Sequence, residues 1–177
     1  MNLTTRDRSG DDIPSLAWFS QVIGPGRGLE PLIDSLHRIR TRFEIHLRGN
    51  CSKSYAQELL ARAPTQWRNL IHFHSQVPHR ELLPRLAEHD AAYAGELPYC
   101  RNRDLTVTNK ILQYLLAGIP VMASDTSGHC EVSAAAGGAV RVFAAGNEAS
   151  LAGLLESRMT DHEWLRRSRE EALDSAL

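Results

Sequence analysis

The sequence predicts a doubly wound α/β domain, with a mainly parallel Rossmann-like sheet and helices on both of its faces. Short apolar runs typical of buried strands alternate along the chain with segments of helical periodicity. Because right-handed crossovers between parallel strands place the connecting helices on both faces, this alternation favours an open sheet. With 177 residues, of which 42% are apolar and 23% charged, the chain fits one globular domain.

The first strand and helix are expected close to the start of the chain. Residues 1–14 form a polar lead that we expect to fray, and the domain is expected over residues 15–177. Leu16–Ile23 is a run of aromatic, branched and small residues, which predicts a buried strand that ends at a Gly-Pro-Gly turn. From Gly28 to Ile39, apolar residues follow the i, i+3, i+4, i+7 spacing of a helix that packs on a sheet.

Two further units of strand and helix follow. The second strand is expected at Phe43–Leu47, ended by Arg48, Gly49 and Asn50, and the second helix at Ser52–Ala63. The third strand is expected at Ile71–His74. The helix after Gln76-Val77-Pro78 should bury Leu82, Leu83 and Leu86 and carry Pro84 near its first turn.

The same alternation continues to the end of the chain. Strands are expected at Ala91–Ala94, Val121–Ser124 and Ala139–Phe143, with a long polar loop after the first of them. Helices are expected at Asn109–Ala117, from about Gly128, and at Asn147–Met159. Thr108 should cap the first of these helices. Thr160 and Glu163 form a capping box that predicts a last, charged helix docked on the surface.

The balance of charge and the lack of long apolar runs exclude several classes of protein. The 20 basic residues are matched by 21 acidic ones, so we expect no nucleic-acid partner. No apolar stretch approaches the roughly 20 residues that a transmembrane helix needs. The polar start has no apolar core of a signal peptide, which favours a cytoplasmic protein.

Cysteine and histidine spacing predicts no metal site. The three cysteines, Cys51, Cys100 and Cys130, form neither a disulfide framework nor a zinc-ribbon pattern. His72 and His74 would share one face of a strand, but no carboxylate or further histidine follows at ligand spacing. We therefore expect strand-end or surface histidines and no bound metal.

Two loops at predicted strand ends are suited to an anionic ligand. Gly24, Gly26 and Gly28 surround Arg27, so a phosphate could approach the backbone beside a guanidinium, although the same glycines would also suit a plain turn. The second loop brings Thr106, Thr108, Asn109 and Lys110 to a helix N-terminus, where free backbone amides attract anions. A cation in the first turn opposes the helix dipole, and an anionic ligand would offset that cost.

These residues resemble a known family. The segment from Asn109 to Asp125, NKILQYLLAGIPVMASD, is similar to the donor-binding signature of GT-B glycosyltransferases, the large retaining group written NKxxEYxAxGxPVVAS. FSQVIGPGRGLEPLI resembles the first strand and phosphate loop of that family, and HFHSQVPHRELLPRLAEHDAAYA resembles a later segment in the same order. The resemblance covers about residues 15 to 170 and implies one half of a GT-B fold.

The resemblance also implies a role for individual residues. Arg27 corresponds to the basic residue that neutralises the donor diphosphate, and Gln76 and Val77 fall in the turn that touches the nucleobase. Thr108, Asn109 and Lys110 face the phosphates or the sugar. Gln113 takes the position of the glutamate that holds the ribose hydroxyls, and an amide can still accept one hydrogen bond and donate another.

Three positions depart from the family pattern. The paired glutamates of the family, eight positions apart, fall on Leu105 and Gln113, so the carboxylate near the donor sugar is absent unless Glu96 replaces it. The basic residue often found beside the first-loop glycine is Gln21. These changes mark either a different donor or a weakened site, and no catalytic residue is assigned.

The expected function is that of a donor-binding domain, which transfers a sugar from a nucleoside diphosphate sugar to an unknown acceptor. Arg27, Lys110 and backbone amides would stabilise the leaving group, so that no metal or other cofactor is required. The acceptor domain of the family is absent from the 177 residues, so a separate chain or a missing N-terminal domain is expected to supply it. The alternative is a non-catalytic module that binds a nucleotide sugar or assists a partner.

Other nucleotide enzymes and hydrolases are disfavoured by missing motifs. A dinucleotide-dependent oxidoreductase should have GxGxxG and an acidic residue after its second strand, where this chain has Arg48 and Gly49. The P-loop motif GxxxxGK[ST] and the nucleophile motif GxSxG are also absent from the sequence.

Overall fold

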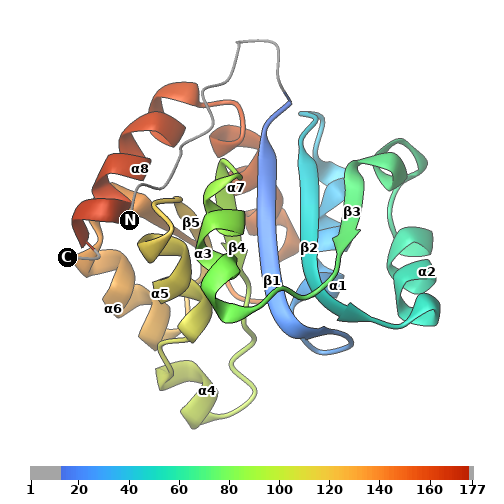
Figure 1. Ribbon diagram of the computed structural model, residues 1–177, viewed down its shortest axis with the longest axis horizontal. Coiled ribbons are helices and arrows are strands. Elements are labelled where there is room, and N and C mark those ends of the chain that lie inside the picture. The colour runs from blue at the N-terminus through green and yellow to red at the C-terminus, as the bar shows by residue number, and fades with distance from the viewer. Residues whose placement is uncertain (1–12, 176–177) are drawn as a thin grey trace.

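Six parallel strands form one twisted sheet in the computed structural model of the chain, which describes residues 13–175 (Figure 1). The strand order is β3-β2-β1-β4-β5-β6, so the sheet grows from β1 in both directions and its order reverses between β1 and β4. Such a reversal leaves a crevice beyond the carboxyl ends of the two strands. The strands are β1 Ser15–Ile23, β2 Glu44–Cys51, β3 Ile71–His74, β4 Ala91–Ala94, β5 Val121–Ser124 and β6 Val140–Phe143.

Helices connect the strands and cover the sheet. They are α1 Leu29–Ser35, α2 Lys53–Arg62, α3 His79–Ala87, α4 Arg101–Leu105, α5 Asn109–Leu116, α6 Ser127–Ala135, α7 Glu148–Arg158 and α8 His162–Ser175. Short 3-10 turns lie at Leu36–Arg38, Thr65–Leu70 and Gly137–Ala139. The predicted doubly wound α/β fold is confirmed. Within residues 13–175, no helix has both the length and the apolar character needed to cross a bilayer.

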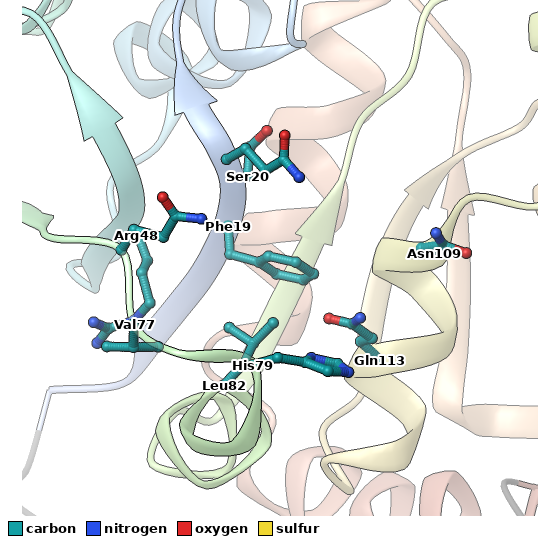
Figure 2. Close-up of a pocket in the computed structure, with 10 residues that line it drawn as sticks. Phe19, Ser20, Arg48, Val77, His79, Leu82, Asn109 and Gln113 are labelled. Atoms are coloured by element: carbon teal, nitrogen blue, oxygen red, sulfur yellow. The ribbon is translucent and has the colours of Figure 1, made fainter.

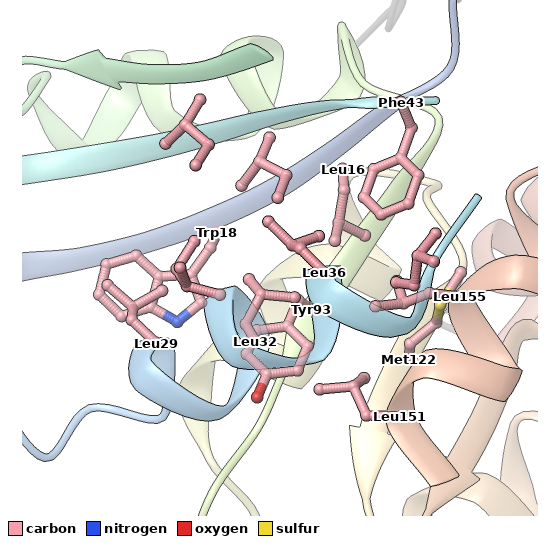
Figure 3. Close-up of a cluster of buried hydrophobic side chains, with 14 of the residues drawn as sticks. Leu16, Trp18, Leu29, Leu32, Leu36, Phe43, Tyr93, Met122, Leu151 and Leu155 are labelled. Atoms are coloured by element: carbon pink, nitrogen blue, oxygen red, sulfur yellow. The ribbon is translucent and has the colours of Figure 1, made fainter. Parts of the chain in front are cut away.

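Two separate cores lie on the two faces of the sheet. On one face, large side chains of β1 and β2 pack against α1, α2 and α7, around Trp18, Leu32 and Leu155 (Figure 3). On the other face, small residues such as Ala17, Ala92 and Ala123 let α3, α5 and α6 approach β1, β4, β5 and β6 closely. Figure 1 shows α3 and α5 in front of the sheet and α1 and α7 behind it.

The structure extends one predicted strand and adds helical turns that the sequence pattern did not predict. β2 continues through Arg48 and Gly49 to Cys51, because the long strand β1 pairs with it as far as Ile23. Gly49 permits this pairing, since a Cβ there would lie 2.4 Å from the carbonyl oxygen of Ser20. The polar loop after β4 contains the short helix α4, and Pro84 lies inside α3 instead of near its first turn.

Two predicted helix caps use other contacts. Thr108 occupies the N-cap position of α5, but its side chain makes no capping hydrogen bond. The capping box of Thr160 and Glu163 is wrong, because Asp161 accepts the hydrogen bond from the Trp164 N–H at 2.8 Å. The last helix buries Trp164 and Leu165, so it belongs to the core and is more than a surface addition.

The predicted lead is only partly described. Residues 1–12 lie outside the described residues, as do residues 176–177 at the other end. At Pro14 the chain has already joined the sheet, since the Glu44 N–H donates to the Pro14 carbonyl at 2.8 Å.

Gly28→Ala should lower the free energy of unfolding by at least about 2 kcal/mol, because the residue has a left-handed backbone and its Cβ would meet a neighbouring carbonyl. The φ angle of Gly28 is 78°, and a Cβ would lie 2.1 Å from the Gly95 oxygen. Urea denaturation measures the change. The control is Gly153→Ala on the exposed side of α7, where a Cβ meets no atom within 4 Å. This control should stabilise the protein by up to about 1 kcal/mol; equal effects of the two substitutions would contradict the role of the Gly28 contact.

Candidate functional site

Two adjoining clefts lie at the crevice between β1 and β4 and share the residues Phe19, Ser20, Gln21 and Asn109. The first, here named the amide cleft, has a volume of about 330 Å³ and is completed by Arg48, Gln76, Val77, His79, Leu82 and Gln113. The second, here named the charged cleft, has a volume of about 350 Å³ and is completed by Arg27, Glu96, Arg103, Thr108 and Lys110. The register of β1 with β2 shifts between Phe19 and Val22, at the point where Ser20 and Gln21 enter both clefts.

The charged cleft is organised around the carboxylate of Glu96. Its side chain is only 9% exposed, and it accepts hydrogen bonds from Lys110 Nζ and Arg103 Nη1, each at 3.0 Å. Lys110 Nζ also lies 5.3 Å from the centre of the Trp18 ring, a cation–π distance. Glu96 therefore balances the cation in the first turn of α5, so part of the cost that we expected an anionic ligand to offset is already met by the protein. With Arg27, three cations face one carboxylate in this cleft, so it retains a net positive charge.

A buried hydrogen-bond network holds Glu96 and Thr108 in place. The Glu96 N–H donates to Ser124 Oγ at 2.8 Å, and His129 lies between Ser124 and Thr108. His129 Nδ1 is 3.0 Å from the Ser124 carbonyl oxygen, and its Nε2 is 3.2 Å from Thr108 Oγ1. Because a carbonyl only accepts, Nδ1 carries the ring proton, and Nε2 accepts from the Thr108 hydroxyl. The Thr108 hydroxyl therefore donates its hydrogen bond to His129, so its oxygen can only accept hydrogen bonds from a group in the cleft.

Burial lowers the pKa of His129 below its ordinary value, despite the opposing effects of the Ser124 carbonyl and of Glu96. The imidazole is therefore neutral at pH 7, as the tautomer derived from its two hydrogen bonds requires.

The amide cleft combines an aromatic ring with amide and guanidinium groups. Figure 2 shows Phe19 between Arg48 and Val77 on one side and Asn109 and Gln113 on the other. The turn that carries Gln76 is fixed from β2, since Arg48 Nη1 donates to the Ser75 carbonyl at 3.1 Å and Asn50 Nδ2 donates to Gln76 Oε1 at 3.0 Å. Two side chains of β2 therefore tie this turn to the strand.

Gln113 has an unpaired polar atom in the amide cleft. Its Oε1 is buried and has no hydrogen-bond partner among the described residues. A buried carbonyl oxygen without a partner costs about 1 to 3 kcal/mol, which a ligand hydroxyl or N–H would recover. Because Gln113 also lines the amide cleft, a ligand donor that reached this oxygen would give it a partner.

The glycine loop contributes one side chain to the clefts. Arg27 lines the charged cleft and its Nη1 lies 3.4 Å from Ser20 Oγ, whereas Gly24 and Gly26 line neither cleft. The Gly26 N–H donates to Glu30 Oε1 at 3.2 Å, so this amide already has a partner. Arg27 is the member of the loop that can reach a ligand.

The structure thus brings most of the predicted site residues together. Gln76, Val77, Asn109 and Gln113 line the amide cleft, and Arg27, Thr108, Asn109 and Lys110 line the charged cleft. The prediction did not include Phe19, Arg48, His79, Leu82 or Arg103. The sequence pattern ends the second strand at Arg48, so it does not predict that this side chain lies on a face of β2. Arg103 reaches the charged cleft from the short helix α4, which the polar sequence of its loop does not predict.

The chain matches one protein family and several solved structures. The sequence model of the family described as "Glycosyl transferases group 1" matches residues 14–161. No curated protein sequence matches the chain significantly.

Three solved structures illustrate the likeness of the fold. WaaG, a glycosyltransferase involved in lipopolysaccharide biosynthesis, is 17% identical with a TM-score of 0.71, over 94% of this chain and 43% of WaaG. Anabaena Alr3699/HepE, in complex with UDP and glucose, is 21% identical with a TM-score of 0.70, over 93% of this chain and 43% of that protein. The catalytic domain of cholesterol-alpha-glucosyltransferase from Helicobacter pylori is 15% identical with a TM-score of 0.70, over 93% of this chain and 98% of that chain. The chain therefore spans less than half the length of the first two structures.

Stability should depend on pH through His129. The folded state disfavours the charged imidazole, so the unfolded state binds the proton first as the pH falls below the ordinary pKa of 6.5. The neutral ring therefore contributes fully to the free energy of unfolding above pH 6.5. This contribution is lost as the pH falls from 6.5 to the lower pKa of the folded state. His129→Gln should therefore reduce the slope of unfolding free energy against pH between pH 7 and 5 by up to about 1.4 kcal/mol per pH unit. Urea unfolding across this range measures the slope, and the exposed His162→Gln should leave it unchanged; identical slopes for wild type and His129→Gln would refute the assignment.

Proposed function

The chain belongs to the family of glycosyl transferases group 1, and from this premise we propose that its two clefts bind a nucleoside diphosphate sugar as the donor of the transferred sugar. The fold is one Rossmann-like domain of the GT-B architecture. The observation that carries the proposal is the pairing, in adjoining clefts, of a net positive charge with an unsatisfied amide oxygen. A nucleoside diphosphate sugar combines the two matching features, an anionic diphosphate and hydroxyl groups that can donate hydrogen bonds.

In this proposal the charged cleft holds the diphosphate. Arg27 and Lys110 both line this cleft, and the N-terminus of α5 adds backbone amides and the partial positive charge of a helix end. The charge that develops on the leaving nucleoside diphosphate would be stabilised by these groups, without a metal ion in the mechanism. The oxygen of Thr108, oriented by His129, would accept a hydrogen bond from the sugar or its hydroxyls.

The amide cleft would hold the nucleoside. Gln76 and Val77 lie in the turn next to β3 and can contact the base, and Gln113 Oε1 can accept a hydrogen bond from a ribose hydroxyl. Phe19 offers a ring in the centre of the cleft, to which apolar parts of the nucleoside can pack. The complex of Alr3699/HepE with UDP and glucose supports a donor of this class, since that protein shares the fold.

Glu96 is a carboxylate that lines the charged cleft, where the diphosphate and sugar are proposed to lie. The family glutamate at the corresponding earlier position is Leu105 here, and that side chain is 56% exposed and lines neither cleft. Glu96 enters from the preceding loop and is held between Lys110 and Arg103. We therefore propose Glu96 as the acidic group at the donor sugar, in place of the missing family glutamate.

Sugar transfer would need a second, acceptor-binding domain beside this one, on the same polypeptide or on another. The clefts open at the carboxyl ends of the strands of a single sheet. A domain that binds the donor alone does not hold an acceptor in near-attack geometry, which can lower the reaction barrier by about 7 to 11 kcal/mol. The second candidate function is a non-catalytic module that binds a nucleotide sugar or assists a partner. The replacement of both family glutamates, by Leu105 and Gln113, is the observation that favours it.

Donor binding is tested by calorimetric and thermal-shift titration of the chain with UDP, GDP, ADP and their sugars. One nucleotide should raise the midpoint of unfolding, and Arg27→Ala and Lys110→Ala should each weaken its binding about tenfold or more, because each removes a charge-assisted hydrogen bond. Arg42→Ala is the matched control, since Arg42 is exposed just before β2, at the other end of the sheet. If no nucleotide binds at millimolar concentration, or if Arg42→Ala weakens binding as much as Arg27→Ala, the proposed donor site is wrong.

Substitutions of Gln113 separate the ribose contact from the phosphate contacts. Gln113→Leu should stabilise the unliganded protein or leave it unchanged, because it removes an unpaired buried oxygen, and should weaken nucleotide binding about tenfold. Gln113→Glu restores the family carboxylate and should bind the nucleotide at least as tightly as wild type. The same calorimetric titration measures both variants. Unchanged affinity in Gln113→Leu would show that this side chain does not contact the ligand.

A further inference from the structure

Four histidines and a glutamate gather on a part of the sheet that lies outside the two clefts. Glu44 and His46 stand on β2, His72 and His74 stand on β3, and alternation along each strand directs all four to the same face. His89, two residues after the end of α3, completes the group, with its ring centre 4.5 Å from that of His46. On this face the helices pack over β1, β4, β5 and β6, and the helices of the described residues leave this part of β2 and β3 to polar side chains.

The pairing of β2 with β3 brings three ligand groups close together. His46 and His72 are direct partners in the parallel register, and Glu44 precedes His46 by two residues. Glu44 Oε2 is 3.2 Å from His46 Nε2, and Glu44 Oε1 is 3.6 Å from His72 Nε2. One ligand atom of each residue lies within 4.8 Å of the other two. The prediction that no carboxylate or further histidine complements His72 was wrong, because the pairing of two strands, which spacing along one strand does not reveal, supplies both.

The histidine side chains carry two features that ion pairing with Glu44 leaves unexplained. His72 Nε2 is buried and has no hydrogen-bond partner in the described part of the chain. His46 Nδ1 is 2.9 Å from His74 Nε2, a contact that can fix the orientation and tautomer of the His46 ring.

We propose that Glu44, His46 and His72 form a binding site for a divalent transition-metal ion such as Zn²⁺, with His74 as the positioning residue that orients His46. Two imidazoles and a carboxylate are a common ligand set for this class of ion. The donation of a proton from the second ring nitrogen of a ligand histidine to a neighbour is typical of such sites.

Geometry and access agree with a site of three protein ligands and one water. A tetrahedral ion with bonds of about 2.1 Å separates its ligand atoms by about 3.4 Å, and the ligand atoms of Glu44, His46 and His72 all lie within 4.8 Å of one another. The side chains of His46, Glu44 and His72 are 17%, 33% and 36% exposed, so the group borders solvent, and a small rotation of the His72 ring would open its buried Nε2 to an ion. The ion would tie β3, the edge strand of the sheet, to β2.

The proposal is tested on the full chain, freed of any polyhistidine tag, by calorimetric titration with Zn²⁺ and by the visible absorption of bound Co²⁺. One ion should bind per chain, with a tetrahedral cobalt spectrum that lacks a thiolate charge-transfer band, and Zn²⁺ should raise the midpoint of thermal unfolding. His72→Ala and Glu44→Gln should each weaken binding about a hundredfold or more, and His74→Ala by about 10- to 100-fold, as expected for a residue that contacts only a ligand. The exposed His162→Ala on α8 is the matched control and should bind as wild type does.

Several results would overturn the site. They are the absence of zinc binding at millimolar concentration, a thiolate band that points to cysteine ligands, and wild-type affinity in His72→Ala or Glu44→Gln. His46 is the most buried ligand, and its replacement can impair folding, so the two more exposed ligands carry the test, with circular dichroism to confirm that each variant is folded. Removal of the metal by a chelator should leave nucleotide affinity within about twofold, which distinguishes this site from the donor clefts.

Discussion

The close packing of β1 against β4 is the contact on which the clefts depend. Tyr114, buried in α5, spans both strands, because its hydroxyl accepts a hydrogen bond from the Phe19 N–H at 3.3 Å and donates to the Tyr93 carbonyl at 3.2 Å. The Tyr93 hydroxyl in turn donates to the Gly28 carbonyl at 2.8 Å. The two tyrosines therefore fix the start of α1 and the position of α5 against the same pair of strands. Phe19 and the N-terminus of α5, which face each other across the clefts, keep their separation for this reason.

The carboxylate of Glu96 sets the electrostatics of the charged cleft. Glu96 is held by a backbone hydrogen bond to Ser124 and by two cations, so removal of either cation would leave a poorly solvated charge. The arrangement keeps Lys110 ordered and lowers, without removing, the positive charge that an anion would meet. A diphosphate would share Lys110 with Glu96, which favours ligands whose own hydroxyls can approach the carboxylate. A sugar attached to the diphosphate has such hydroxyls, whereas a free nucleoside diphosphate ends in a phosphate and has no sugar beyond it.

Local sequence patterns predicted the elements well where the chain itself marks their ends. β3, β4 and β5 were predicted to the residue, because turn residues or charges border each apolar run. β2 was predicted too short because Gly49 suggests a strand end, whereas pairing with the long strand β1 carries β2 past it. The predicted side-chain cap at Thr108 failed for a similar reason, since the hydroxyl is engaged by His129 from 21 residues further along the chain. Partners that are distant in sequence decided each of these outcomes, and one sequence alone does not reveal them.

The alternation of side chains along β2 explains why the polar residues of both proposed sites lie on one face of this strand. Alternation places Ile45 and Leu47 in the large core, so His46 and Arg48 must point to the opposite face. Over β1 and β4 that face is filled by small residues under α3 and α5, but over β2 and β3 its polar side chains remain partly exposed. Arg48, nearer the carboxyl end, therefore reaches the amide cleft, while His46, two residues earlier, meets His72 and Glu44. A single strand can serve two chemically different sites because two residues on the same face, two positions apart along the strand, have different neighbours.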